Sequence, residues 1–178
     1  MILGMSTATF TLLHVLISLV GIGSGLVVIY GFLTSNRLDR WTLLFLVTTV
    51  ATSVTGFFFP IQHLTPGLVV GVLSLLLLAV AIGARYSLQM KGAWCATYVV
   101  TASIALYFNV FVLVVQSFEK VPALHALAPT QKESPFAVAQ LLILAVFATL
   151  TVLALKRFHP GSSAAASGLA SSDKKRAA

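Results

Sequence analysis

The stretch GLVVGVLSLLLLAVAIGARY, residues 67–86, carries no charge before its nineteenth position, Arg85. A transmembrane helix needs about 20 consecutive apolar residues, because a rise of about 1.5 Å per residue has to cover a hydrocarbon core about 30 Å thick. The stretch has that length. It is preceded by Thr65 and Pro66, a capping hydroxyl followed by a proline at the first helical position. The stretch therefore predicts a membrane-spanning helix.

Four other stretches of the chain have the same character. Together they predict five spans, at about 7–33, 41–59, 67–86, 93–117 and 136–156. Strands of a membrane barrel would be about ten residues long with alternating polarity, and the sequence does not show that pattern. We therefore expect an all-α membrane bundle of five transmembrane helices over residues 1–157. A disordered cytoplasmic tail is expected to follow over residues 158–178.

The composition agrees with a chain that lies in lipid. Of the 178 residues, 58% are hydrophobic and only 8% are charged, whereas soluble domains carry roughly 25% charged residues. So few charges cannot cover a water-facing surface, and the lipid bilayer is the expected surrounding. The net charge of +7 is spread over loops and the tail, which excludes a nucleic-acid-binding domain. The single cysteine, Cys95, excludes an intramolecular disulfide.

The distribution of lysine and arginine predicts the orientation, because cytoplasmic loops of membrane proteins are enriched in both. With the N-terminus outside, the outer segments hold only Lys120 and Lys132, each next to a glutamate. The cytoplasmic segments then hold the other nine basic residues: Arg37, Arg40, Arg85, Lys91, Lys156, Arg157, Lys174, Lys175 and Arg176. We expect an outer N-terminus and a cytoplasmic C-terminus.

Polar side chains within the spans are expected to face the interior of the bundle, because lipid offers them no hydrogen-bond partner. The predicted depths bring one polar set together in the outer half of the protein. This candidate ligand or cofactor cluster consists of His14, Asn109 and Gln140 in the spans, with His63, His125 and Gln116 above them. Stripes of small residues at helical spacing predict a second set, for close helix packing: Ser18, Gly21, Gly25, Ala102 and Ala105.

The two outer loops share a short motif. PIQH at 60–63 and PALH at 122–125 both read Pro-x-x-His, and each is followed by a hydroxyl–proline helix start. The spans before the two loops run in the same direction, so the hairpins would form parallel repeats of the kind known in some transporters. Leucine-rich runs match easily by chance, and the repeat stays a hypothesis.

No catalytic set is complete. The four acids, Asp39, Glu119, Glu133 and Asp173, lie in loops and in the tail, so no serine–histidine–acid arrangement is expected. Imidazole suits haem, copper and zinc, but the histidines follow no recognised metal spacing, and the metal remains undefined. We favour a non-enzymatic accessory, assembly or homo-oligomeric membrane component. Two alternatives stay open: a haem-, metal- or quinone-binding redox protein that uses the outer cluster, and a small transporter or channel.

The stretch ALYFNVFVLVVQSFEKVPALHALAPTQKESPF, residues 105–136, together with GFFFP at 56–60 and KGAW at 91–94, resembles a group of small bacterial inner-membrane proteins. The similarity runs through most of the chain. It implies a multi-pass protein of the bacterial inner membrane. It supplies no activity, cofactor or site residue, so the candidate residues rest on the sequence pattern alone.

Overall fold

The computed structural model describes residues 2, 4–59 and 66–159 of the chain. The predicted all-α fold is confirmed. In the described ranges the only extended feature is an isolated bridge between Ile2 and Met5. The helical elements are α1 (Thr7–Leu33), α2 (Asp39–Gly56), α3 (Pro66–Ile82), the π-helical turn η1 (Gly83–Ser87), α4 (Ala93–Lys120), α5 (Pro122–Leu127) and α6 (Ser134–Arg157).

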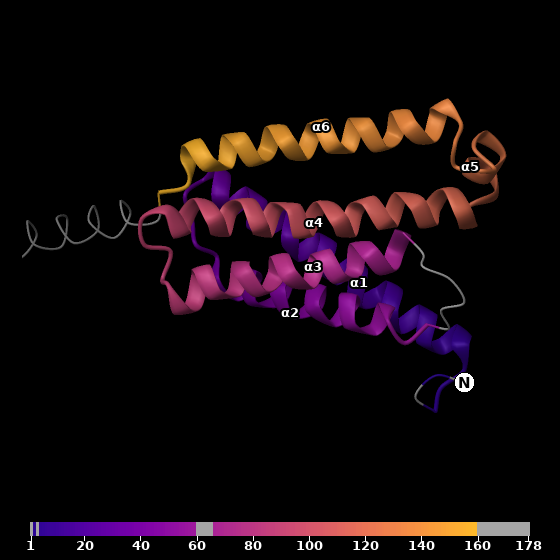
Figure 1. The fold of residues 1–178 in the computed structure, drawn as a ribbon, viewed down its shortest axis with the longest axis horizontal. Helices are drawn as coiled ribbons and strands as arrows, with labels where there is room; N and C mark the ends of the chain where they lie inside the picture. The colour runs from indigo at the N-terminus through magenta and orange to yellow at the C-terminus, as the bar shows by residue number, and fades with distance from the viewer. Residues whose placement is uncertain (1, 3, 60–65, 160–178) are drawn as a thin grey trace, which may run out of the picture.

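The five long helices alternate in direction along a common axis (Figure 1), so α1 begins at one end of the bundle and α6 finishes at the other. We call the end that carries α5 the α5 end. The opposite end, where α1, η1 and α6 finish and α2 and α4 begin, is the Arg85 end. His63 and residues 160–178 of the predicted tail lie outside the described residues.

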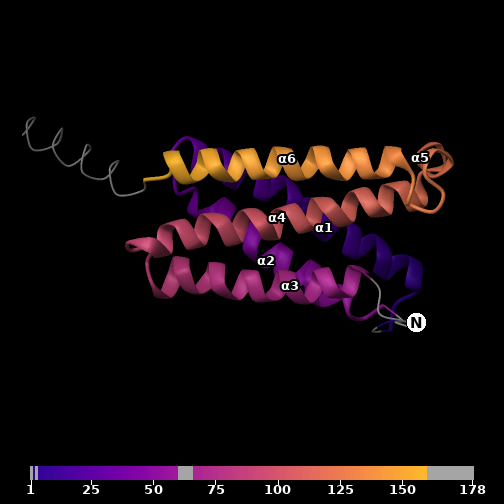
Figure 2. The ribbon, with the colours of Figure 1, turned by 45° about the horizontal axis from the view of Figure 1, so that its top comes forward.

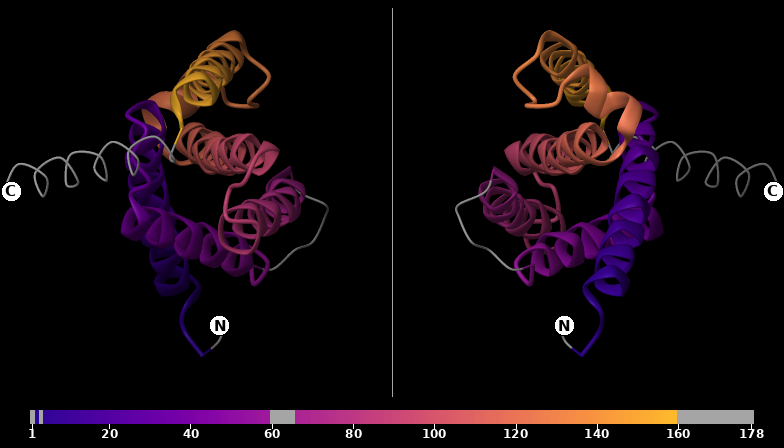
Figure 3. Two further views of the ribbon diagram at one scale, coloured as in Figure 1. Left: turned by 90° about the vertical axis from the view of Figure 1, so that its left-hand side faces the viewer. Right: turned by 90° about the vertical axis from the view of Figure 1, so that its right-hand side faces the viewer.

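Helix α4 is the centre of the bundle. It contacts α1, α2, α3 and α6, and it lies between α6 on one side and α3 on the other in the two longitudinal views (Figures 1 and 2). Helix α6 is peripheral: only its Phe147 and Ala154 are buried. The end-on views show that α6 is separated from α2 and α3 (Figure 3). Most of the surface of α6 is therefore free to face lipid.

Within the described residues, four helices are long and apolar enough to cross a membrane: α1, α3 with its following turn, α4 and α6. The presence of these four helices indicates a membrane protein. Helix α2 is not among them, because its 18 residues begin with Asp39 and Arg40 and include five threonines and a serine. Three of these six hydroxyls, those of Thr48, Thr52 and Thr55, donate to carbonyls of α2 itself, for example Thr48 Oγ1 to Leu44 O at 2.7 Å. Such internal bonds let a helix rich in threonine lie in an apolar setting.

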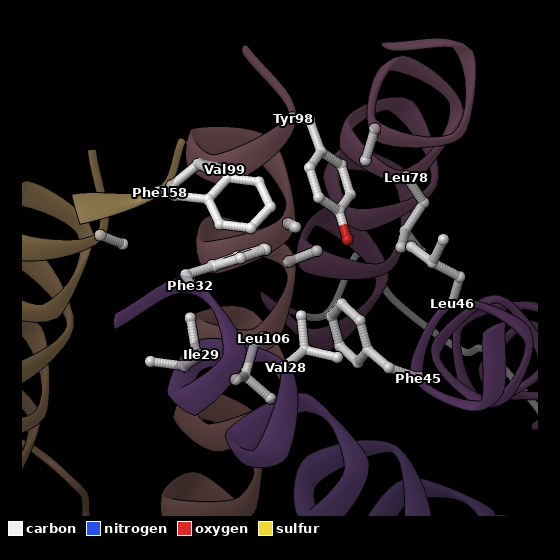
Figure 4. Close-up of a cluster of buried hydrophobic side chains, with 14 of the residues drawn as sticks. Val28, Ile29, Phe32, Phe45, Leu46, Leu78, Tyr98, Val99, Leu106 and Phe158 are labelled. Carbon is white, nitrogen blue, oxygen red and sulfur yellow. The ribbon is translucent and has the colours of Figure 1, made fainter. Parts of the chain in front are cut away.

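The packed core lies where α1, α2 and α4 meet (Figure 4). At Gly25 of α1, a Cβ atom would lie 2.5 Å from Leu106 Cδ1 and 2.9 Å from Phe45 Cδ2. Both neighbours are fully buried, so Gly25 is what permits the close approach of three helices. Its neighbour Gly23 faces open space. The two glycines of one helix turn therefore have different roles.

Candidate functional site

Asn109 lies at the junction of α1, α2 and α4. Its side chain is buried, and its Nδ2 donates to Thr49 Oγ1 of α2 at 3.3 Å. At Gly21 of α1, an added Cβ would lie 3.2 Å from Thr48 Oγ1 and 3.6 Å from Asn109 Nδ2. The glycine therefore lets α1 close over this polar contact and shield it from lipid.

His14 lies nearer the α5 end and pairs with α2. Its Nδ1 is 2.8 Å from Thr55 Oγ1. The same hydroxyl donates to Ala51 O at 2.7 Å, so it accepts from His14, which fixes the proton of the imidazole on Nδ1. The ring of Phe59 packs against the imidazole edge to face, with centroids 5.2 Å apart. His14 thus joins α1 to the end of α2.

The other members of the predicted cluster that the structure describes lie at separate places. Gln140 Nε2 donates to Phe111 O of α4 at 3.3 Å, and its Oε1 is buried without a hydrogen-bond partner among the described residues. His125 lies on α5 with Nδ1 3.3 Å from Phe118 O, and Gln116 is half-buried on α4. No hydrogen bond within the described ranges joins two members of the set. The structure therefore distributes them over several helix contacts.

Two members of the predicted packing set lie where α1 meets α2 and α4: Gly25 lies against Leu106 and Phe45, and Gly21 lies against Thr48 and Asn109. Gly21, Gly25, Ala102 and Ala105 are buried, and Ser18 is half-buried. Histidine, cysteine, aspartate and glutamate form no group of three that could hold a metal ion within the residues that the structure describes.

The Arg85 end contains a cluster that sequence reasoning missed. Arg85 belongs to η1, and its side chain is only 1% exposed. Its Nη2 donates to the carboxylate of Asp39 at the start of α2 and to the carbonyl oxygen of Arg37 at 3.2 Å. A buried guanidinium needs such partners, because an unpaired charge in an apolar interior is costly. The residue expected to be an ordinary charge in a cytoplasmic segment is a buried link between η1 and α2.

Aromatic rings complete the surroundings of Arg85. Its Cζ lies 5.1 Å from the ring centroid of Tyr98 and 5.7 Å from that of Tyr86, within the range of cation–π attraction. Tyr98 in turn packs edge to face on Phe32 of α1, and Phe32 packs on Phe158 after α6 (Figure 4). The row of rings connects the ends of α1 and α6 to the start of α4.

One sequence signal could have revealed this cluster. Asp39 is the only acid in the predicted cytoplasmic loops, among several arginines and lysines. A single acid in such a setting has a choice of cationic partners, and the sequence does not say which one is buried. The structure selects Arg85, while Arg37 lies farther from the same carboxylate, at 3.7 Å.

Comparison with known proteins adds no assignment: no family model, no curated protein and no solved structure matches this chain significantly.

Proposed function

We propose that this chain is a five-span protein of the bacterial inner membrane that acts as a non-enzymatic component, either as an accessory subunit of a membrane complex or as a homo-oligomer. The proposal rests on one observation: the polar side chains inside the bundle form hydrogen bonds between helices. His14, Asn109 and Gln140 each hydrogen-bond to a neighbouring helix. Polar side chains used in this way hold helices together. The bacterial location rests on the resemblance of the sequence.

The alternating direction of the long helices supports α2 as a fifth membrane span. Helix α2 contacts both α1 and α3, and it runs in the direction opposite to them (Figure 1). Its 18 residues extend about 27 Å, close to the thickness of a hydrocarbon core. A helix in that place crosses the bilayer together with its neighbours.

The charges support the orientation. Arg37, Arg40, Lys91, Lys156 and Arg157 are exposed at the Arg85 end. At the α5 end, Lys120 and Lys132 lie beside Glu119 and Glu133, so these charges cancel. The excess of basic residues at the Arg85 end supports a cytoplasmic location for that end.

Cysteine labelling tests the crossing of α2. In a Cys95→Ala background, Asn36→Cys marks the turn before α2 and Gln89→Cys marks the turn after η1, both at exposed positions. If α2 crosses the bilayer, both sites lie on the cytoplasmic side. A membrane-impermeant maleimide added to intact cells should then label both cysteines only after the membrane is opened. Thr130→Cys, at the α5 end, is the control and should react in intact cells. Labelling of Asn36→Cys and Gln89→Cys from opposite sides would mean that α2 does not cross.

The proposed association with further copies or with another membrane protein is tested by measuring the mass of the purified particle. The protein is extracted from native membranes into polymer-bounded lipid discs without detergent, and its mass is measured by light scattering and native mass spectrometry. We expect a species heavier than one chain, formed either by further copies or by a co-purifying membrane protein. Expression at low level, with excess lipid, controls for copies that share a disc by chance. A single chain that co-purifies with nothing contradicts the proposal.

A further inference from the structure

Phe158 fixes the end of α6 against two other segments of the Arg85 end. Its side chain is only 3% exposed. Its ring packs on Phe32 near the end of α1, with centroids 4.9 Å apart (Figure 4), and its carbonyl oxygen lies 3.9 Å from Cys95 Sγ at the start of α4. The amide of His159 then donates to Ser35 Oγ at 2.9 Å. The turn between α1 and α2, the start of α4 and the end of α6 therefore meet around one buried residue.

Each of these three segments carries exposed basic side chains, which we call the basic corner: Arg37 before α2, Lys91 before α4, and Lys156 and Arg157 at the end of α6. The two lysines and Arg157 form no ion pair with any residue that the structure describes. Arg37 lies 3.7 Å from the carboxylate of Asp39, which already accepts from Arg85. The positive charge of the basic corner therefore exceeds the negative charge that the described residues place beside it.

The basic corner lies at the depth of lipid headgroups. Helix α6 has 24 residues, a length of about 36 Å, whereas the hydrocarbon core is about 30 Å thick. The last turn of α6 can therefore extend beyond the core. Exposed Tyr30 in α1 and Trp94 in α4 are residues of the kind that gather at a membrane interface. On the core side of the corner, exposed Leu153 and Leu155 of α6 offer an apolar surface to acyl chains.

We propose that the basic corner binds the headgroup phosphate of an anionic phospholipid, whose acyl chains lie along the apolar surface of α6. Arginine and lysine form charge-assisted hydrogen bonds with phosphate oxygens, and basic residues beside a membrane span attract anionic lipids. A zwitterionic phospholipid carries a cation that offsets its phosphate, so the corner favours the anionic class. A soluble phosphate ester would make the same ionic contacts without the apolar ones. The inference goes beyond the proposed function and requires only that the corner lies at a membrane surface.

Binding is measured on the full-length protein in phosphatidylcholine vesicles. The chain has two tryptophans, and Trp41→Phe leaves Trp94 as the reporter, next to the Cys95 that contacts Phe158. Phosphatidylglycerol brominated in the upper part of its acyl chains replaces phosphatidylcholine stepwise, and quenching of Trp94 gives a relative binding constant. Brominated phosphatidylcholine is the matched lipid control. We expect a constant well above one that falls when NaCl is raised from about 0.1 M to about 1 M, because salt screens exposed charges.

Two variants in the Trp41→Phe background locate the site. Lys156→Gln/Arg157→Gln removes two charges of the basic corner and should lower the relative binding constant about fivefold, the effect expected for a basic residue near an anionic surface. Lys132→Gln removes an exposed basic residue at the α5 end and should leave the constant unchanged. All three side chains are exposed, so the helical content measured by circular dichroism should stay the same.

The proposal is overturned if phosphatidylglycerol is not preferred to phosphatidylcholine, if Lys156→Gln/Arg157→Gln keeps the full preference, or if Lys132→Gln reduces it equally. Replacing chloride by inorganic phosphate at equal ionic strength should leave the preference unchanged. Loss of the preference in phosphate would identify a soluble anion as the ligand and would also overturn the proposal. Lipid preference is read from a tryptophan of the chain and association from particle mass, so the two proposals succeed or fail separately.

Discussion

Asp39→Ala is expected to lower the free energy of unfolding by about 3 kcal/mol, the larger of the two stability effects that we anticipate. The change leaves the buried Arg85 guanidinium without its counter-ion, and breaking a buried ion pair from one side typically costs about 3–5 kcal/mol. The low end applies because Asp39 is itself 71% exposed and the Arg37 carbonyl continues to accept from Arg85. Unfolding by SDS in mixed micelles, followed by circular dichroism, measures the loss.

The Arg85–Asp39 ion pair is asymmetric, because Arg85 is buried and Asp39 is exposed. Removing one residue or the other should therefore have different effects on stability. Arg85→Met removes the buried charge and keeps most of the side-chain volume, so it should cost less than Asp39→Ala. The double variant Asp39→Ala/Arg85→Met should be more stable than Asp39→Ala alone. Arg40→Ala, an exposed charge next to Asp39 in α2, is the matched control and should change stability by about 0.5 kcal/mol or less. A double variant less stable than Asp39→Ala would disprove this account of Arg85.

Gly25→Ala should lower the free energy of unfolding by about 1–3 kcal/mol, because it forces a methyl group into a filled core. The new Cβ would lie 2.5 Å from Leu106 Cδ1, and Leu106 is fully enclosed by its neighbours. Relief requires a shift of α1 away from α2 and α4. The same SDS titration measures the effect.

Gly23→Ala is the matched control for Gly25→Ala. It lies two residues away on the same helix, and an added Cβ meets nothing within 4 Å. Alanine stabilises a helix relative to glycine by roughly 0.5–1 kcal/mol, so this change should be neutral or slightly stabilising. Equal stability of the two alanine variants would contradict close packing at Gly25.

Hydropathy predicted the helices well, because length and apolar composition are local properties of the sequence. The first span, predicted at 7–33, is α1 at Thr7–Leu33, where Ser6 accepts from the Thr9 amide at 3.1 Å and caps the helix. The second, predicted at 41–59, is α2 at Asp39–Gly56. The apolar run continues through Phe57–Phe59, but the helix ends at Gly56, with Phe57 as its C-cap.

The site was less predictable, because its contacts depend on which helices become neighbours. The sequence placed Asn109 and His14 at similar depths, and a shared cluster was a reasonable expectation. In the structure each pairs with a threonine of α2, at Thr49 and Thr55. Periodicity identifies the face of a helix, but it does not identify the helix that packs on that face. The burial of Arg85 depends in the same way on where η1 turns the chain.

The hydroxyl-rich composition of α2 has a consequence for how the chain enters the membrane during synthesis. A helix with Asp39, Arg40 and six hydroxyl side chains gains little by moving into lipid alone, whereas α1 is strongly apolar. Because α2 packs on α1 and follows it after a short turn, we expect the two to leave the insertion machinery as one hairpin. Under the proposed five-span topology, insertion of the apolar α1 would bring its polar neighbour α2 across the bilayer with it.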